Sequence, residues 1–270
     1  AQIRGGSIYD PLDKSGLAYI TGWVLTEGTE SYPDPVIDAA MDAHGAIVTS
    51  VAYNESCIST LTCLSNDTEE LFPYFAEIIS SPAFDNEVIE ESRQYLIGDL
   101  MRKMDDPGEV CSRVFRDHVF RGHRYQKQQT GTIEGLKSIT RDDILEFYDT
   151  YYRPDRAALV IVGDITVAEA KKMCEAHLAK WEASGEPLPI IMPPRQIEGT
   201  HVVLVDSPTS QAQITMGHVG INRTNPDRFK LYVMNHILGG GGLYTRLAEE
   251  VRVKRGLTYG IYCYFARREY

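Results

Sequence analysis

Arg255 and Tyr259, near the end of the 270-residue chain, have the clearest potential for chemistry. Their spacing of four would place both side chains on one face of a helical turn, if the helix predicted before them extends that far. A guanidinium and a phenol both donate hydrogen bonds, which suits them to hold an oxygen that gains negative charge during a reaction. The alternative interpretation is structural, with an arginine on the surface beside a packed tyrosine.

A run of four glycines precedes this pair: Gly239, Gly240, Gly241 and Gly242. Phosphate binding is disfavoured, because no Lys-Ser or Lys-Thr pair follows the glycines and the run comes after a predicted helix rather than a strand. A connection between two helices is the simplest interpretation.

Histidine and cysteine patterns offer no other catalytic or metal site. His118 and His123 are five residues apart with Gly122 between them, so they do not share a helical face, and a solvated helix end is the better interpretation. The other five histidines are scattered singly, and no Gly-x-Ser-x-Gly motif is present. The five cysteines include no CxxC pair and are odd in number, which argues against a disulfide framework and against cysteine-bound zinc.

Composition is that of an ordinary globular protein, with 43% hydrophobic and 24% charged residues. The net charge of -11 disfavours a nucleic-acid surface, which needs clustered Lys and Arg. No apolar run is long enough to cross a bilayer, and no signal peptide opens the printed sequence. The compartment stays open between periplasm and cytoplasm.

Periodicity predicts a mixture of strands and helices. The predicted strands are residues 2–9, 46–53, 56–64, 156–162, 201–205, 211–219 and 259–266. The predicted helices are residues 14–27, 36–44, 68–80, 85–104, 108–120, 144–152, 166–181, 225–238 and a further helix that ends at about residue 254.

Four prolines among polar residues interrupt this pattern and predict a linker at residues 184–198. We therefore expect an N-terminal domain over residues 1–183 and the start of a second domain over residues 199–270. A domain of about 70 residues that stops within a strand predicts that the printed chain is part of a longer protein.

Several segments together resemble one family, the pitrilysin and mitochondrial-processing-peptidase (inverzincin) metallopeptidases. Their order and spacing, from about residue 5 to about residue 265, carry the resemblance. The segments are Gly5-Gly6-Ser7, Ser15-Gly16-Leu17-Ala18, Glu27-Gly28-Thr29, Arg153-Pro154, Gly163-Asp164, Val205-Asp206-Ser207-Pro208 with Gln211 and Gln213, Leu238 with the four glycines, Arg246-Leu247 and Arg255-Gly256-Leu257-Thr258-Tyr259. The resemblance implies an α+β fold of two similar domains, each an antiparallel sheet with helices on one face (LuxS/MPP-like), with the second domain cut short here.

The family binds zinc through His-x-x-Glu-His on its first helix, where the two histidines are ligands and the Glu is the general base. The matching positions here are Tyr19, Gly22 and Trp23, none of which suits those roles. The family's third ligand is a Glu before an Asp-Pro turn, and counting back from Asp106-Pro107 gives Asp99. The substrate-clamping edge strand matches residues 45–52, where the family's Asn is missing. We therefore expect no metal in this chain.

Arg255 and Tyr259 match a pair that, in the family, reaches from the second domain to the zinc site of the first. The resemblance implies a non-catalytic subunit of a heteromeric zinc endopeptidase, with zinc in a homologous partner subunit, a peptide or unfolded polypeptide as substrate, and Arg255 and Tyr259 completing the partner's site. The glycine loop is then either a substrate-contacting loop or a plain connection. The alternative function is a structural or peptide-binding scaffold without peptidase activity.

Overall fold

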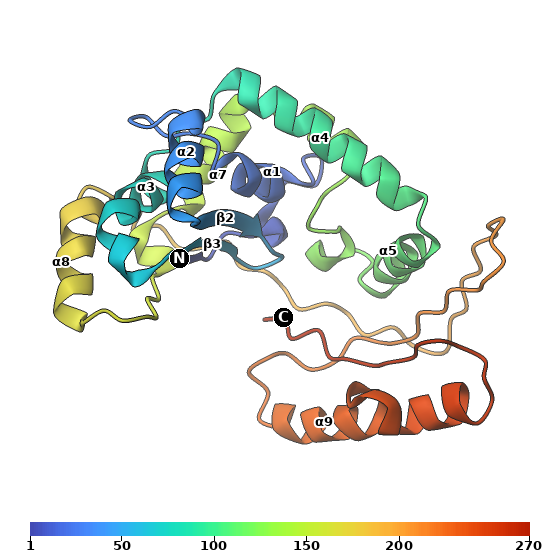
Figure 1. Ribbon diagram of the computed structural model, residues 1–270. Helices are drawn as coiled ribbons and strands as arrows, with labels where there is room; N and C mark the ends of the chain where they lie inside the picture. Colours follow the sequence, from blue (N-terminus) through green and yellow to red (C-terminus); the bar gives the residue numbers. More distant parts are fainter. The chain divides into compact units, whose positions relative to one another are not determined.

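The computed structural model describes residues 1–270 and divides into two units. The first unit contains Ala1–Ile190 and Thr200–Met216, and the second contains Ile191–Gly199 and Gly217–Tyr270. Figure 1 shows the strands and helices α1 to α8 of the first unit and the helical segment around α9 of the second. This division does not test the predicted domain limits, which stay predictions.

One antiparallel sheet forms in the first unit, with strand order β2-β3-β1-β4. Its main part is the hairpin of β2 (Ile47–Ala52) and β3 (Cys57–Thr62), completed by the short strands β1 (Gln2–Ile3) and β4 (Ala157–Ala158). The hairpin register runs from Ile47 opposite Thr62 to Ala52 opposite Cys57. Strand β2 is therefore the outer strand of the sheet.

The helices of the first unit begin close to where the sequence predicts, except α6, which was not predicted. They are α1 (Leu17–Val24), α2 (Asp34–His44), α3 (Thr68–Ser80), α4 (Asn86–Met104), α5 (Pro107–Val119), α6 (Ile133–Ser138), α7 (Arg141–Tyr151) and α8 (Val167–Leu178). Local capping explains the accuracy: the Thr140 hydroxyl accepts from the Asp143 nitrogen while the Asp143 carboxylate accepts from the Thr140 nitrogen.

The core lies between the sheet and α1, α3, α4 and α7, and Figure 1 shows α1 between β2 and α4. Its helical members are apolar side chains that recur every three or four residues, as an amphipathic helix requires. They include Leu17, Ile20, Leu71, Phe75, Ile79, Leu96, Leu100, Ile144 and Phe147, which are joined by Ile3 of β1.

Two predicted strands are shorter than expected. Strand β1 ends at Ile3 and a 3-10 turn (Ser7–Tyr9) follows, because the chain packs closely there: a Cβ on Gly6 would lie 2.4 Å from the Tyr53 carbonyl oxygen. The strand predicted for residues 156–162 pairs only over Ala157–Ala158, since β1 offers a two-residue partner.

The second unit has helices but no sheet. It contains α9 (Arg228–Asn235), π-helical turns at His236–Gly240 and Ala248–Val253, and a 3-10 turn at Gly242–Tyr244. Three predicted strands do not form, because no backbone ladder pairs these β-branched and aromatic segments: residues 201–205 and most of 211–219, which belong to the first unit, and residues 259–266 of the second. The expected sheet in a second domain is thus not seen. No helix is long and apolar enough to cross a membrane.

Candidate functional site

Helix α1 carries the positions of the predicted zinc motif, and a buried carboxylate fixes where it begins. Gly16 adopts φ 106° before the helix, a conformation that favours glycine. Asp10 is buried, and its carboxylate accepts hydrogen bonds from the nitrogens of Gly16 (2.7 Å) and Ala18 (2.9 Å). Burial raises the pKa of Asp10 to about 7, although those amides and the Arg124 guanidinium act in the opposite direction.

The motif positions face α4 and β2 rather than an open cavity. Gly22 is buried, and a Cβ there would lie 3.2 Å from the Ala52 nitrogen of β2. Trp23 stacks on Tyr95 of α4, with ring centroids 5.2 Å apart and planes 26° apart. Tyr19, one turn before Trp23, is half-buried, and burial raises the pKa of its phenol.

Asp99, on the same face of α4, is held by two cations of its own helix. Its carboxylate lies 2.7 Å from the Lys103 ammonium and 3.2 Å from the Arg102 guanidinium. The hydrogen bond from Lys103 lowers the pKa of Asp99, and the same bond raises the pKa of Lys103. The charge of Lys103 also acts on Tyr19. The Asp99 carboxylate is therefore already paired with the Lys103 ammonium of its own helix.

Arg255 and Tyr259 lie in the second unit, after the last helical turn ends at Val253. Gly256 adopts φ 60°, so the expected single helical face does not exist and the two side chains are displayed by a turn. The Arg255 guanidinium lies 2.9 Å from the Glu250 carboxylate. Tyr259 is 90% exposed, and Arg252, not Arg255, lies over its ring at 4.9 Å. The structure brings the pair to one exposed segment without joining the two side chains.

The glycine run is partly helical rather than a simple loop. Gly239 and Gly240 belong to the π-helical turn His236–Gly240. Gly239 is buried, and a Cβ there would lie 2.8 Å from the Cys263 sulfur, so only glycine fits. Gly242 adopts φ 81° in the open. This accounts for the glycines structurally, and a role in substrate contact stays a prediction.

Comparison with known families assigns nearly the whole chain to one of them. Residues 2–132 match the model described as insulinase (peptidase family M16), and residues 138–269 match the model described as peptidase M16 inactive domain. The chain belongs to the M16 peptidase family. The resemblance to pitrilysin and mitochondrial processing peptidase is thereby confirmed, since both are members of this family.

Relatives of this M16 chain carry several different names. An uncharacterized zinc protease of Streptomyces coelicolor is 26% identical over 93% of this chain and 55% of its own length. A probable mitochondrial-processing peptidase subunit beta of Schizosaccharomyces pombe is 23% identical over 88% of this chain and 52% of its own. Subunit 1 of the human mitochondrial cytochrome b-c1 complex is 20% identical over 90% of this chain and 52% of its own. The chain thus spans little more than half the length of these relatives.

A solved structure shows the same fold. The crystal structure of a peptidase M16 inactive domain from Pseudomonas fluorescens superimposes with a TM-score of 0.84 at 25% identity, covering 99% of this chain and 65% of that one. The α+β fold with an antiparallel sheet and covering helices is therefore established for this chain.

Zinc, on which the M16 family depends, does not fit the residues at the motif positions of this chain. The indole of Trp23 is stacked on Tyr95, Gly22 has no side chain, and the Asp99 carboxylate is paired with Lys103. Nowhere do three His, Cys, Asp or Glu side chains gather as metal ligands. A protein site for zinc needs at least three such donors. We therefore derive no chemistry from a metal in this chain.

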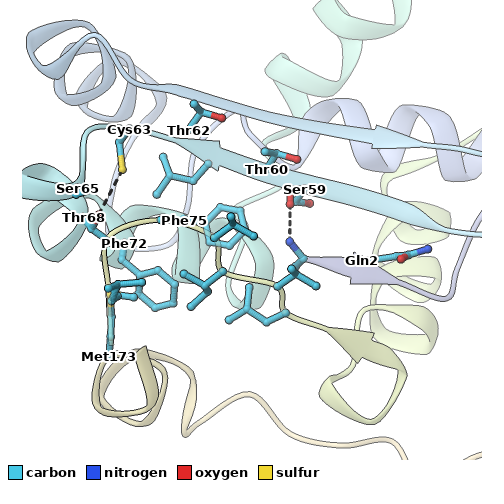
Figure 2. Close-up of a pocket in the computed structure, with 18 of the residues that line it drawn as sticks. Gln2, Ser59, Thr60, Thr62, Cys63, Ser65, Thr68, Phe72, Phe75 and Met173 are labelled. Atoms are coloured by element: carbon cyan, nitrogen blue, oxygen red, sulfur yellow. Dashed lines mark hydrogen bonds between the residues drawn. The ribbon is translucent and has the colours of Figure 1, made fainter. Parts of the chain in front are cut away.

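A separate cavity of about 440 Å³ lies beside β3 (Figure 2). It is bounded by β3, the segment 158–165, α3 and α8, with Phe72, Phe75 and Met173 among its apolar lining. Its polar contacts are local, such as the Ala1 amino group donating to the Ser59 carbonyl at 2.6 Å. No nucleophile and base meet there, so it is not a catalytic candidate.

Sequence reasoning missed three residues that shape the α1 face: Asp10, Tyr95 and Lys103. Tyr95 and Lys103 stand four residues before and after Asp99, so the helical period could have found them. Asp10 lies six residues before the Gly16 nitrogen that it caps, and only the folded turn brings the two together.

Proposed function

We propose that this chain is a non-catalytic subunit of a heteromeric zinc metalloendopeptidase, which hydrolyses peptide bonds. It supplies peptide-binding and transition-state-stabilising residues to a homologous subunit that carries zinc. The observation that carries the proposal is the contrast within one M16 chain: Trp23 and Asp99 are tied into internal contacts, while Tyr259 is left 90% exposed. The relative named as a subunit of a processing peptidase supports a heteromeric assembly.

The chemistry of Arg255 and Tyr259 suits this role. The Tyr259 hydroxyl makes no hydrogen bond within the chain, and Arg255 uses one guanidinium nitrogen, Nη1, for Glu250. The remaining N–H and O–H donors are free to bind the carbonyl oxygen of a peptide as it becomes negatively charged. Because that charge is larger in the transition state than in the bound substrate, these donors act on kcat more than on binding.

The decisive experiment is Tyr259→Phe in the complex reconstituted with the zinc-bearing subunit. The substitution removes only the hydroxyl, so we expect kcat to fall by about 100-fold, as for loss of other oxyanion donors. Tyr262→Phe is the matched control, because Tyr262 is a nearby tyrosine that is 76% exposed, and it should keep the unmodified rate. Zinc content and subunit association are measured alongside. Normal assembly with an unchanged kcat for Tyr259→Phe would refute the shared-site proposal.

A structural or peptide-binding scaffold is the second candidate, and one relative favours it. Subunit 1 of the human cytochrome b-c1 complex bears no peptidase name yet matches 90% of this chain. Copurification separates the two functions: a zinc-motif homologue bound to this chain supports the peptidase subunit, whereas stable assembly without any such homologue supports the scaffold.

A further inference from the structure

The cavity beside β3 lies where β1 begins, between two segments that both continue past that point (Figure 2). Strand β1 is the inner neighbour of β3 and β4 and pairs antiparallel with both. Beyond the level of Ala1, β3 continues to Thr62, and residues 159–165 follow β4 along the opposite wall of the cavity. The cavity therefore continues the line of β1.

Both walls of the cavity alternate as strands do, although the wall after β4 is paired only over Ala157–Ala158. Every second side chain is buried or half-buried, and those between are exposed. The first set is Ser59, Leu61, Cys63, Leu159 and Ile161, and the second set is Thr60, Thr62, Val160 and Val162. This alternation is typical of a sheet that packs one face on helices and exposes the other. Each wall is thus suited to pair with a strand that lies between them.

Hydrogen bonds at the start of β1 show which backbone groups of β3 face the cavity. The Ala1 amino group donates to the Ser59 carbonyl at 2.6 Å, and the Ser59 nitrogen donates to the Ala1 carbonyl at 2.9 Å. Antiparallel strands bond through every second residue, so the next N–H and C=O on this edge belong to Leu61.

The same rule applies to the wall after β4. The Arg4 nitrogen donates to the Arg156 carbonyl at 3.0 Å, so every second residue from Arg156 onward presents its N–H and C=O to this side. Those of Val160 and Val162 come after the last paired residue, Ala158, and face the cavity. Backbone groups in such a place need hydrogen-bond partners.

A small molecule is the alternative occupant of a cavity of this size. Such sites orient their ligand with a few convergent polar side chains. Here the lining from α3 and α8 is apolar, with Phe72, Phe75 and Met173, and the polar groups are backbone groups in two facing rows. Two rows at strand spacing fit the two edges of a β-strand better than they fit a compact ligand.

We infer that the cavity takes a four-residue strand that continues β1 beyond Ala1 as part of the same chain. Gln2 lies opposite Ile58 and Ala158, so continuing both registers places these four residues opposite residues 60–63 and 160–163, which line the cavity. The inference goes beyond the proposed function and holds equally for a scaffold protein.

The register also sets the character of the four residues. Counted back from Ala1, the second and fourth point to the same side as Ala1 and Ile3, which pack on the core, so they are apolar. The first and third point to the same side as the exposed Gln2, so polar β-branched residues suit them. With this strand in place, the sheet covers the aromatic lining of α3, and β4 lengthens to residue 163.

Two extensions of the 270-residue chain test the register. One joins Val-Thr-Val-Thr to Ala1, which turns both valines toward the cavity lining. The matched control joins Thr-Val-Thr-Val, which has the same composition but turns both valines to solvent. Amide hydrogen exchange of both proteins and of the unextended chain is followed residue by residue by NMR.

We expect Val-Thr-Val-Thr to slow exchange of the Leu61, Val160 and Val162 amides by at least about tenfold, because each gains a backbone partner. Thr-Val-Thr-Val should leave them within about twofold of the unextended chain. The Thr60 amide is an internal control that should not change, since the alternation directs it to β2. Equal protection by both extensions, or protection by neither, would overturn the inference.

A third arm separates a strand of the same chain from a strand of another molecule. The blocked peptide Val-Thr-Val-Thr is added at about 1 mM to the unextended chain, and the joined strand should protect more strongly because it is held at a high effective concentration. Protection by the free peptide that equals or exceeds that of the joined extension would refute the inference and assign the cavity to a partner's strand.

Discussion

Side chains on the α1–α4 face make contacts within the chain, whereas those around residues 255–259 are largely exposed to solvent. On the α1–α4 face, the carboxylate of Asp99 is paired, the ring of Trp23 is stacked and Gly22 is closed against β2. Around residues 255–259, Tyr259 stands in solvent and Arg255 keeps donors free. The first region uses its side chains for internal contacts, whereas Tyr259 in the second region is exposed to solvent.

Under the proposed function, this difference corresponds to a chain that has lost the metal-binding half of an active site and kept the hydrogen-bond donors of the other half. Replacing only the metal ligands of such a site would leave buried polar groups without partners, which lowers stability. At the positions that match the family's motif, Trp23 stacks on Tyr95 and Asp99 pairs with Lys103. Donors that act on a substrate cannot be internally satisfied, so their exposure is what a retained function requires. Stability and function should therefore separate cleanly between the two regions.

The largest expected effect in the α1 region is a pH dependence that comes from Asp10. Its pKa is raised from 3.8 to about 7 in the folded chain, so the folded state holds a proton that the unfolded state releases between those values. Stability therefore falls as pH rises through this window, by at most about 4 kcal/mol. Asp10→Asn mimics the protonated form and should remove this contribution.

The measurement is urea unfolding of both proteins at several values between pH 4 and pH 7. The difference in unfolding free energy, unmodified minus Asp10→Asn, should decrease steadily as pH rises. A constant difference would mean that Asp10 titrates alike in the folded and unfolded states. Burial would then not raise its pKa as expected, and Asp10 could not be counted among the internally satisfied groups of the α1 region.

A second, smaller effect compares two helical glycines. At Gly22 a Cβ would meet the Ala52 nitrogen at 3.2 Å and the Tyr152 hydroxyl at 3.7 Å. We expect Gly22→Ala to cost about 1–3 kcal/mol through overpacking, and Gly22→Glu, the family's residue, to cost more. At Gly98 of α4 the nearest group is the end of the Arg102 side chain at 4.0 Å, so Gly98→Ala should stabilise by about 0.5–1 kcal/mol.

Thermal unfolding of the two alanine variants decides this prediction through the sign of the change. Opposite signs would show that α1 is closed against β2 at Gly22, the position that matches the family's general base. A stabilising Gly22→Ala would mean that the helix and strand have room for a side chain there, and that the motif position could be restored.

The sequence predicts the first unit well because its helices are specified locally. Thr140 with Asp143 and Thr166 with Glu169 form capping boxes, and Asp106 caps α5, so helix starts can be read from neighbouring residues. The strands predicted for residues 201–205, 211–219 and 259–266 depend on a distant partner strand, which no local pattern supplies. These segments have the residue types of strands, but a strand forms only where a partner strand pairs with it.

The candidate site likewise has features that sequence spacing predicts and features that depend on tertiary packing. Tyr19, Gly22, Trp23 and Asp99 were found because the family's motif has fixed spacing. That Asp99 would pair with Lys103 and that Trp23 would stack on Tyr95 depends on how α1 packs on α4, which spacing does not give. For Arg255 and Tyr259 the predicted helical face is wrong because the helix ends at Val253, and their functional role stays a prediction.

The smallest expected effect on stability comes from a Tyr-to-Phe substitution, and it gives a direct comparison because the same substitution can be made in both units. Tyr148 is buried in the first unit and its hydroxyl donates to the Ile79 carbonyl at 3.1 Å, so Tyr148→Phe removes a buried hydrogen bond and should cost about 1 kcal/mol. The Tyr259 hydroxyl is in solvent, so Tyr259→Phe should change stability by less than about 0.5 kcal/mol. Both are measured by urea unfolding followed by far-ultraviolet circular dichroism, which reports on both units. If Tyr259→Phe cost as much as Tyr148→Phe, the hydroxyl would be part of the folded framework, and a fall in turnover of that variant could no longer be assigned to a lost donor. If Tyr148→Phe costs about 1 kcal/mol more unfolding free energy than Tyr259→Phe, the Tyr259 hydroxyl does not stabilise the fold. Any fall in turnover of Tyr259→Phe can then be assigned to a lost contact with the substrate.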